Sequence, residues 1–276
     1  MGAARRPGRR HVPRPHQQEE GEAQVKDTLV RVEDIGPIGH REGMALAETE
    51  YKRFADVLAQ LAPDDWSKQT VNTDWNVKQL AQHVLGFAES NASFRVFAKA
   101  MRAGRKRAKE KGYDHFIHGT NEVQVEERDH LSPAQLVERW NTTWPRALKG
   151  RRRFPPFMRP IPLDFGPVIG KKPMGSYLMD VVFTRDTWMH RIDICRAVGV
   201  DPVVTHEHEG RLVQDMVAEW TRLYGLDVTL HLEGPAGGTY VSGNGREELT
   251  IDAVEWIWIL SGRGTGTGLL EKELPL

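Results

Sequence analysis

The chain has 276 residues, of which 39% are hydrophobic and 28% are charged, a composition that is ordinary for a globular protein of one large or two modest domains. Its 38 lysines and arginines balance its 38 aspartates and glutamates, so no basic excess favours a nucleic acid as partner. The single cysteine, Cys195, excludes an internal disulfide and indicates a cytoplasmic protein. The longest apolar run near the C-terminus, Trp256–Leu260, is far too short to cross a membrane.

The N-terminal segment, residues 1–27, is rich in Arg, Pro, His and Glu and has few apolar residues. It cannot bury enough surface to offset the entropy lost on ordering, so we predict a disordered basic tail. No apolar stretch follows its arginines, which excludes a secretory signal. The tail is either an arm that contacts phosphates or, the interpretation we favour, an extension without function.

Apolar residues at helical spacing predict a first helix over Met44–Leu61, which Pro63 ends. After a loop, a second helix begins at Asn76. This residue can cap the free backbone N–H groups, and Gln79 completes a capping-box pattern. Within the apolar stripe of this helix lies His83.

A third helix is predicted over Phe94–Lys111. Its last turns are basic, and we interpret them as a solvated helix end rather than a nucleic-acid surface, because no aromatic residues alternate with the basic ones. Ser132 begins a further helix, and residues 151–172, with five prolines, predict an irregular connection. A long helix follows over Ser176–Ala197, and four such helices suffice for a four-helix bundle.

The pattern changes in the C-terminal quarter. A helix over Arg211–Leu223 precedes a strand that begins at Val228, a glycine-rich hairpin region and a last strand over Glu248–Ile251. Asp252 then caps a short helix that ends at Leu260. We therefore predict a tail (1–27), a helical bundle (28–202) and a small α+β C-terminal domain (203–276).

Asp186 and His190 are four residues apart, so both project from one helix face and can chelate one divalent ion. A third ligand must come from another helix, and His83 is the natural candidate. Two other interpretations stay open on spacing alone: His83 as a hydrogen-bonded core histidine, and Asp186 with His190 as an ordinary surface pair.

Two segments carry a family resemblance. Residues 75–84 match a Trp-x-Val-x-x-Leu-x-x-His pattern, and residues 185–193 match an acid-x-x-x-His-x-x-Asp pattern. Both resemble the metal-ligand helices of the mycothiol-dependent maleylpyruvate isomerase family, an actinobacterial branch of the DinB-like superfamily. Residues 230–234 and 252–263 resemble the small C-terminal domain of that family. The resemblance extends over roughly residues 40 to 270.

The resemblance implies a mainly α fold, a DinB-like four-helix bundle followed by a small α+β domain. It implies His83, Asp186 and His190 as ligands of a divalent metal, zinc in the first place, with nickel or iron as alternatives. A three-ligand site leaves a coordination position open, which in the family the thiol of mycothiol enters. The isomerase has a glutamate where this chain has Asp186, whose shorter arm would shift the metal or the helix spacing.

The resemblance therefore implies an enzyme that depends on a divalent metal and on mycothiol as co-substrate. It would act on small electrophiles as an isomerase or S-transferase, and its partners would be a small-molecule thiol and an electrophilic substrate, with neither membrane nor nucleic acid. The alternative is a non-catalytic DinB-like metal-binding protein with a regulatory or interaction role. No catalytic residue beyond the metal ligands is assigned.

Other residues near these segments carry weaker hypotheses. Asp193 either orients a ligand imidazole or pairs with a cation such as Arg196. Cys195 points away from the ligand face, so we interpret it as a packed small residue. Arg185 and Arg191 flank the helix, where solvated side chains are more usual than anion-binding ones.

Two further pairs of residues, a histidine pair and a tryptophan pair, could in principle serve a site. His115 and His118 lie in a predicted loop with no third ligand nearby, which argues against a metal site. Trp66 and Trp75 are interpreted as core or loop anchors rather than stacking platforms.

Overall fold

The structure, a computed structural model, describes residues 29–164 and 173–274. The predicted tail over residues 1–27 and residues 165–172 of the proline-rich connection lie outside the described residues.

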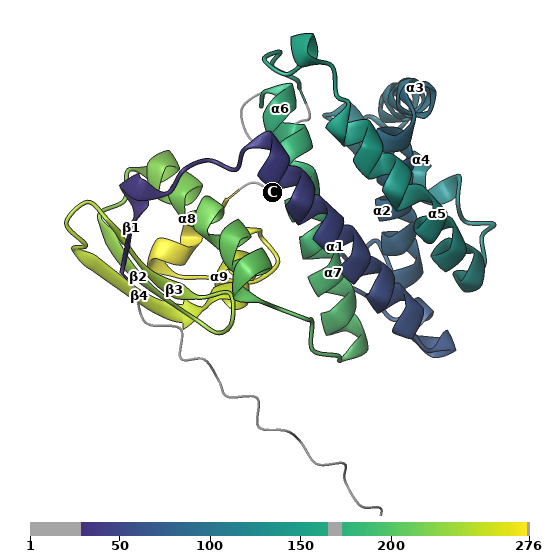
Figure 1. The fold of residues 1–276 in the computed structure, drawn as a ribbon. Helices are drawn as coiled ribbons and strands as arrows, with labels where there is room; N and C mark the ends of the chain where they lie inside the picture. Colours follow the sequence, from purple (N-terminus) through teal and green to yellow (C-terminus); the bar gives the residue numbers. More distant parts are fainter. Residues whose placement is uncertain (1–28, 165–172, 275–276) are drawn as a thin grey trace, which may run out of the picture.

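Four long helices form a bundle (Figure 1). They are α1 (His40–Gln60), α2 (Val77–Ala92), α5 (Pro133–Arg152) and α7 (Phe183–Val198). The helices α1 and α2 each pack against both α5 and α7, so the four close into a ring around an apolar core. Phe54, Leu80 and Trp140 are fully buried in this core. The predicted mainly α fold with a four-helix bundle is thereby confirmed.

The predicted helix starts rest on their capping residues. The side chain of Asn76 accepts from the Gln79 N–H at 2.9 Å, and Gln79 accepts in return from the Asn76 N–H at 3.0 Å. Ser132 and Gln135 form the same reciprocal pair at the start of α5. These local hydrogen bonds satisfy N–H groups that a helix leaves free, so the sequence alone locates both helix starts.

Two more helices, α3 (Phe94–Lys111) and α4 (Phe116–Glu126), pack on each other and against α2. The basic end of α3 is partly neutralised by α4, because Arg107 pairs with Glu122 and Glu126 at 2.9 and 2.6 Å. The predicted loop around His115 was wrong in part: His115 caps α4 through the Ile117 N–H.

The predicted helix over Ser176–Ala197 is present, but it is not uniformly α-helical. A single turn, α6 (Gly175–Tyr177), leads into a π-helical turn, η5 (Leu178–Val182), and then into α7. The helix ends at Gly199, whose φ of 78° lies in the left-handed region that glycine tolerates best. The π turn adds a residue to the helical register just before the segment with Asp186 and His190.

The C-terminal part consists of two helices and most of a four-stranded sheet, which confirms the predicted α+β class. Its elements are the π-helical turn η6 (His206–Gly210), α8 (Arg211–Tyr224), β2 (Val228–Glu233), β3 (Gly238–Ser242), β4 (Glu247–Asp252) and α9 (Ala253–Leu260). The strand order is β1-β3-β2-β4; β2 is antiparallel to β3 and parallel to β4. The edge strand β1 (Val30–Arg31) pairs parallel to β3 and was not predicted.

Short 3-10 turns complete the described chain: η1 (Val32–Asp34), η2 (Pro63–Ser67), η3 (Pro156–Met158) and η7 (Gly268–Glu271). None of the helices in the described part of the chain is both long and apolar enough to cross a membrane.

The helix α7 belongs to both cores. Trp188, Met189 and Ile192 pack into the apolar cluster of the sheet, α8 and α9, whereas Ile194 packs into the bundle. Figure 1 shows α7 on the side of the bundle that faces the C-terminal part. Most polar side chains on α7 are therefore buried, and Arg196 near its C-terminal end is exposed. The domain boundaries at residues 27 and 202 stay predictions.

Candidate metal centre

His83 lies on the inner face of α2, where it is only 5% exposed. Its Nδ1 has no hydrogen-bond partner among the described residues. The indole of Trp75, just before the helix, covers the imidazole at a ring distance of 4.8 Å. Burial, and after it the proximity of His190, lowers the pKa of His83 to about 4. The imidazole is thus neutral near pH 7, which is the form that binds metals.

Asp186 and His190 meet His83 from α7. The Nε2 of His190 lies 3.5 Å from Asp186 Oδ1, and the rings of His83 and His190 stand perpendicular with centroids 5.2 Å apart. One ligand atom from each of the three residues lies within 4.8 Å of the other two. The structure thus brings together the three residues that the sequence selects, from helices separated by about a hundred positions.

Asp193 lies behind His190. Its Oδ2 is 3.0 Å from His190 Nδ1, so it fixes the ring with Nε2 turned toward Asp186. Its cation is Arg263, whose Nε and Nη2 donate to the two carboxylate oxygens at 2.8 and 3.1 Å. Arg196 pairs instead with Glu255 at 2.7 Å. Asp193 therefore fills both roles that the sequence left open: it orients the imidazole of His190, and it pairs with a cation, which is Arg263 rather than Arg196.

The charges at this site offset one another. Burial alone would lower the pKa of His190, but Asp186 and Asp193 raise it to about 9. Burial alone would raise the pKa of either carboxyl, and the neighbouring His190 holds both below their usual range. In the absence of a metal, a proton on His190 takes the place of the positive charge that the two carboxylates favour.

A second cluster also brings three potential ligands together: Glu50, His208 and Glu209. Here the carboxylates already have partners. Arg191 donates to both oxygens of Glu50, at 2.7 and 3.1 Å, and to Glu209 at 2.6 Å. Glu209 also pairs with Arg53. We therefore assign this cluster as an ion-pair network that joins α1, α7 and η6 rather than as a metal site.

The interpretation of Arg185 and Arg191 as solvated side chains was wrong, because their exposed fractions are 1% and 0%. Arg185 pairs with Asp215 and Glu219 of α8 at 2.6 and 2.7 Å. Arg185 is buried against α8, and Arg191 is buried against α1 and η6, whose Glu50 and Glu209 balance its charge.

Other sequence hypotheses have simpler outcomes. Cys195 is fully buried, and burial raises the pKa of its thiol. Within the described residues, His115 and His118 join no cluster of metal-ligating side chains. Trp66 is buried in the bundle core, as an anchor would be. The role of Trp75 against His83 and that of Arg263 were missed, the latter because 70 residues separate it from Asp193.

The comparison with protein families bears on the same segment. The family described as mycothiol maleylpyruvate isomerase N-terminal domain matches residues 47–195, which are more than half of the chain and include all three candidate ligands. The chain belongs to this family.

Solved structures agree on the fold of this family member. The crystal structure of the mycothiol-dependent maleylpyruvate isomerase superposes with a TM-score of 0.53 at 17% identity, over 86% of this chain and 93% of that one. The structure of a histidine-to-alanine mutant of that enzyme gives a TM-score of 0.52 with the same identity and coverage. No curated protein matches the sequence. At this identity the superpositions show a shared fold, which here extends into the C-terminal part.

Proposed function

We propose that this chain is a divalent-metal- and mycothiol-dependent enzyme that acts on small electrophiles as an isomerase or S-transferase. The observation that carries the proposal is the convergence of His83, Asp186 and His190 from two helices of a bundle whose family is named for such an isomerase. In the network around them, Asp193 restrains His190, as an acidic residue behind a ligating histidine commonly does.

The donor set fits a divalent metal of the zinc type. Two ligands at about 2.1 Å from a tetrahedral ion lie about 3.4 Å apart, and His190 Nε2 lies 3.5 Å from Asp186 Oδ1. On the facing helix, the unpartnered Nδ1 of His83 is a buried polar atom that a bound ion or water would satisfy. Two neutral imidazoles and one carboxylate suit zinc, and also nickel or iron.

A divalent ion held by these residues would acidify a coordinated thiol and so supply a thiolate near neutral pH. The protein residues have distinct tasks around it. Asp193 and Arg263 hold His190 in one orientation, and the indole of Trp75 packs against the imidazole of His83. Both contacts hold a ligating imidazole in place, so the side chains would need to move less when a metal ion binds.

The thiol is proposed to come from a co-substrate because the chain has no suitable nucleophile of its own. Cys195 is its one cysteine, fully buried and with a raised thiol pKa. Thiolate, not thiol, is the reactive form, so Cys195 is a poor candidate. Mycothiol is the thiol for which the family is named.

The experiment measures metal and thiol chemistry on the same protein. We expect purified protein to contain about one divalent ion per chain, and His83→Ala and His190→Ala to lose it. His118→Ala, which changes a half-exposed histidine on α4, should keep the metal. The metal-loaded protein should then consume mycothiol or isomerise a member of a panel of small electrophiles, including maleylpyruvate.

Two results would contradict the proposal at different points. Wild-type protein without metal, or equal metal in all variants, would rule out the site. A full metal complement with no turnover on the panel would instead favour a non-catalytic metal-binding protein.

A further inference from the structure

Gln124 lies on α4, which packs against the face of α2 that carries His83. A Cβ atom added to Gly86 would lie 2.8 Å from the Cβ of Gln124, so the absence of a side chain at Gly86 lets α4 approach α2 closely. Gly86 follows His83 by three residues and therefore shares its face of the helix. Gln124 is only 3% exposed, so it is a buried neighbour of the candidate ligand.

Hydrogen bonds fix the C-terminal end of α4 to α2. Arg128, just after α4, donates from Nη1 to the Gln124 carbonyl at 2.6 Å and pairs with Glu89 of α2. In return, Gln82 of α2 donates from Nε2 to the Arg128 carbonyl at 3.0 Å. The backbone that carries Gln124 is therefore held against α2 by contacts that do not involve the Gln124 side chain.

Two buried polar atoms at this contact have no hydrogen-bond partner among the described residues, Nδ1 of His83 and Oε1 of Gln124. The two side chains are close enough to interact: burial lowers the pKa of His83 to about 4, and the Gln124 side chain, as a hydrogen-bond acceptor, acts in the opposite direction. An amide oxygen can only accept, whereas a neutral imidazole carries one hydrogen, on either nitrogen. A hydrogen on Nδ1 would therefore satisfy both atoms at once.

The position of this hydrogen decides which nitrogen of His83 is free to bind an ion. With the hydrogen on Nδ1, the ring presents the lone pair of Nε2. An ion at Nδ1 would instead leave Oε1 of Gln124 without a hydrogen to accept. His190 is arranged in the first way, since Asp193 occupies its Nδ1 and its Nε2 is turned toward Asp186. Both histidines would then offer the same nitrogen to the metal.

We propose that Gln124 is a positioning residue of the candidate metal centre, whose Oε1 accepts from Nδ1 of His83 and so directs Nε2 of that ring to the metal ion. The proposal rests on the proposed function, because the metal is the one proposed there. Gln124 does for His83 what Asp193 does for His190. Being a neutral amide, it adds no charge to a site that already has the carboxylates of Asp186 and Asp193.

The first test is the tautomer of His83 in the metal-free protein near pH 7, read from long-range proton–nitrogen correlations in the NMR spectrum. His83→Ala identifies the signal by its loss. We expect the hydrogen on Nδ1 in the wild type. Gln124→Met keeps the length of the side chain but removes the amide oxygen, so it should give a mixture of the two tautomers.

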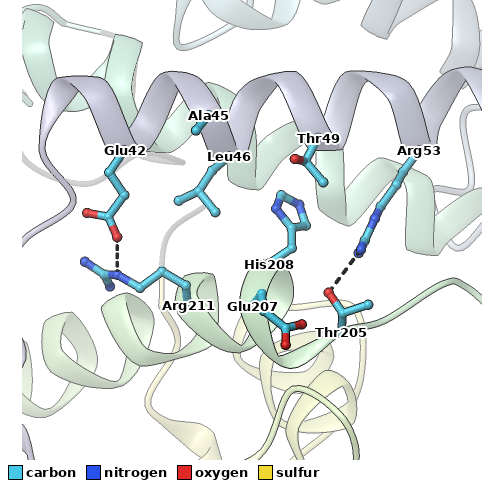
Figure 2. A pocket seen from close by; sticks show the side chains of 9 residues that line it. All are labelled: Glu42, Ala45, Leu46, Thr49, Arg53, Thr205, Glu207, His208 and Arg211. Carbon is cyan, nitrogen blue, oxygen red and sulfur yellow. Dashed lines mark hydrogen bonds and ion pairs between the residues drawn. The ribbon is translucent and has the colours of Figure 1, made fainter.

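His208 provides an internal reference in the same spectra. It is also buried with an unpartnered Nδ1, but its Nε2 lies 3.0 Å from Glu50 Oε2. A carboxylate accepts, so His208 should carry its hydrogen on Nε2, with and without the Gln124 side chain. Figure 2 shows His208 facing Thr49 where α1 meets η6, and it belongs to a different cluster of side chains from His83.

The second test is zinc affinity, measured by competition with a chromophoric chelator on variants that circular dichroism shows to be folded. We expect Gln124→Met to bind zinc about tenfold more weakly than the wild type or worse. Gln124→Glu restores an acceptor and should bind more tightly than Gln124→Met. Gln82→Met is the matched control and should bind as the wild type does, because Gln82 is buried at the same helix contact but bonds to Arg128.

Three results would overturn the proposal: a hydrogen on Nε2 of His83 in the metal-free wild type, equal zinc affinity in the wild type and Gln124→Met, or equal losses in Gln124→Met and Gln82→Met. The first needs no folded variant. Zinc that is lost in His83→Ala but held unchanged in Gln124→Met would refute the role of Gln124 and leave the proposed function standing. Wild-type protein that binds no zinc would contradict both.

Discussion

Asp193 connects two residues, His190 on its own helix and Arg263 after α9. It accepts from His190 through one oxygen and from Arg263 through both, and it is only 2% exposed. A buried carboxylate in this position sets which nitrogen of the imidazole faces the candidate metal. Its contribution to metal affinity can therefore be measured without removing a ligand.

We predict that Asp193→Asn weakens zinc affinity by about 10- to 100-fold, because a neutral amide offers one acceptor oxygen where His190 and Arg263 now share two charged ones. Competition with a chromophoric chelator measures this. Glu255→Gln is the matched control, since Glu255 also pairs an arginine of α7 with the C-terminal part but contacts no candidate ligand. Equal losses in both variants would point to a general loss of stability instead.

Asp186, a candidate metal ligand, can be tested by two substitutions. Asp186→Glu keeps the charge, lengthens the arm by one methylene and introduces the residue that the sequence resemblance associates with the isomerase. We expect it to retain zinc within about tenfold of wild type, whereas Asp186→Asn should lose about 100-fold or more. Metal affinity of Asp186→Asn equal to wild type would exclude Asp186 as a ligand.

Individual site residues could be predicted from the sequence where their spacing places them on one helix face. They could not be predicted where a partner comes from a distant part of the fold. The spacing of Asp186 and His190 and the placement of His83 in an apolar stripe predicted three side chains that the structure brings together. Arg263 could not be predicted as the partner of Asp193, because nothing local links residues 70 positions apart.

Among the elements, α7 is the one on which the rest of the molecule packs. Its residues face the bundle, the sheet domain, the candidate metal centre and the network of Glu50, Arg191 and Glu209. Because of this burial, Arg185 and Arg191 are enclosed although their positions in the sequence predict solvated side chains. A charge beside an amphipathic pattern is normally solvated, and only the packing of α1 and η6 around α7 encloses Arg191.

We predict that Arg191→Met lowers the free energy of unfolding by about 3–5 kcal/mol, because Glu50 and Glu209 would remain buried without their shared cation. Urea denaturation followed by circular dichroism gives the value. Arg196→Met, on the same helix but 37% exposed and paired with Glu255, should cost about 1 kcal/mol or less. A loss of similar size in the two variants would contradict the role of the buried network.

The same network predicts a dependence of stability on pH. Burial alone would raise the pKa of Glu209, but Arg53, the Thr205 N–H and Arg191 hold it below the usual 4.5. A depressed pKa in the folded state contributes stability that is present above about pH 4.5 and is lost as the pH falls further. Urea midpoints between pH 6 and pH 3 should therefore fall less steeply in Glu209→Gln, and identical slopes would show that Glu209 contributes nothing.

Helix starts could be predicted from the sequence where a capping side chain accepts hydrogen bonds from the first turn. The starts of α2, α5 and α9 were predicted from Asn76, Ser132 and Asp252, each of which accepts from the first turn of its helix. The strand β1 could not be predicted, because two residues are too few to show an alternating pattern. Its pairing with β3 also joins segments that lie far apart in the sequence.

The molecule as a whole joins a bundle to a small α+β part through a shared apolar surface. Trp188, Met189 and Ile192 of α7 are fully buried against the sheet side, together with Trp220 and Trp256. The extent of this surface shows that the C-terminal part is packed onto the bundle rather than attached by a linker alone.

We predict that a chain ending at residue 202 does not fold to a stable monomer, because it exposes the apolar face of α7 and removes Arg263 from Asp193. Size-exclusion chromatography and thermal denaturation of the truncated chain test this. A monomer with a cooperative transition and zinc affinity equal to that of the full chain would show that the bundle is independent of the C-terminal part.

The most direct test of the central claim is zinc K-edge X-ray absorption on the zinc-loaded protein, before and after addition of mycothiol. We predict two imidazole ligands and one carboxylate oxygen at about 2.0–2.2 Å in the first sample, with a new sulfur at about 2.3 Å only in the second. His83→Ala should lose one imidazole from this pattern. Zinc without imidazole ligands, or no sulfur at saturating mycothiol, would contradict the metal- and thiol-dependent site proposed at His83, Asp186 and His190.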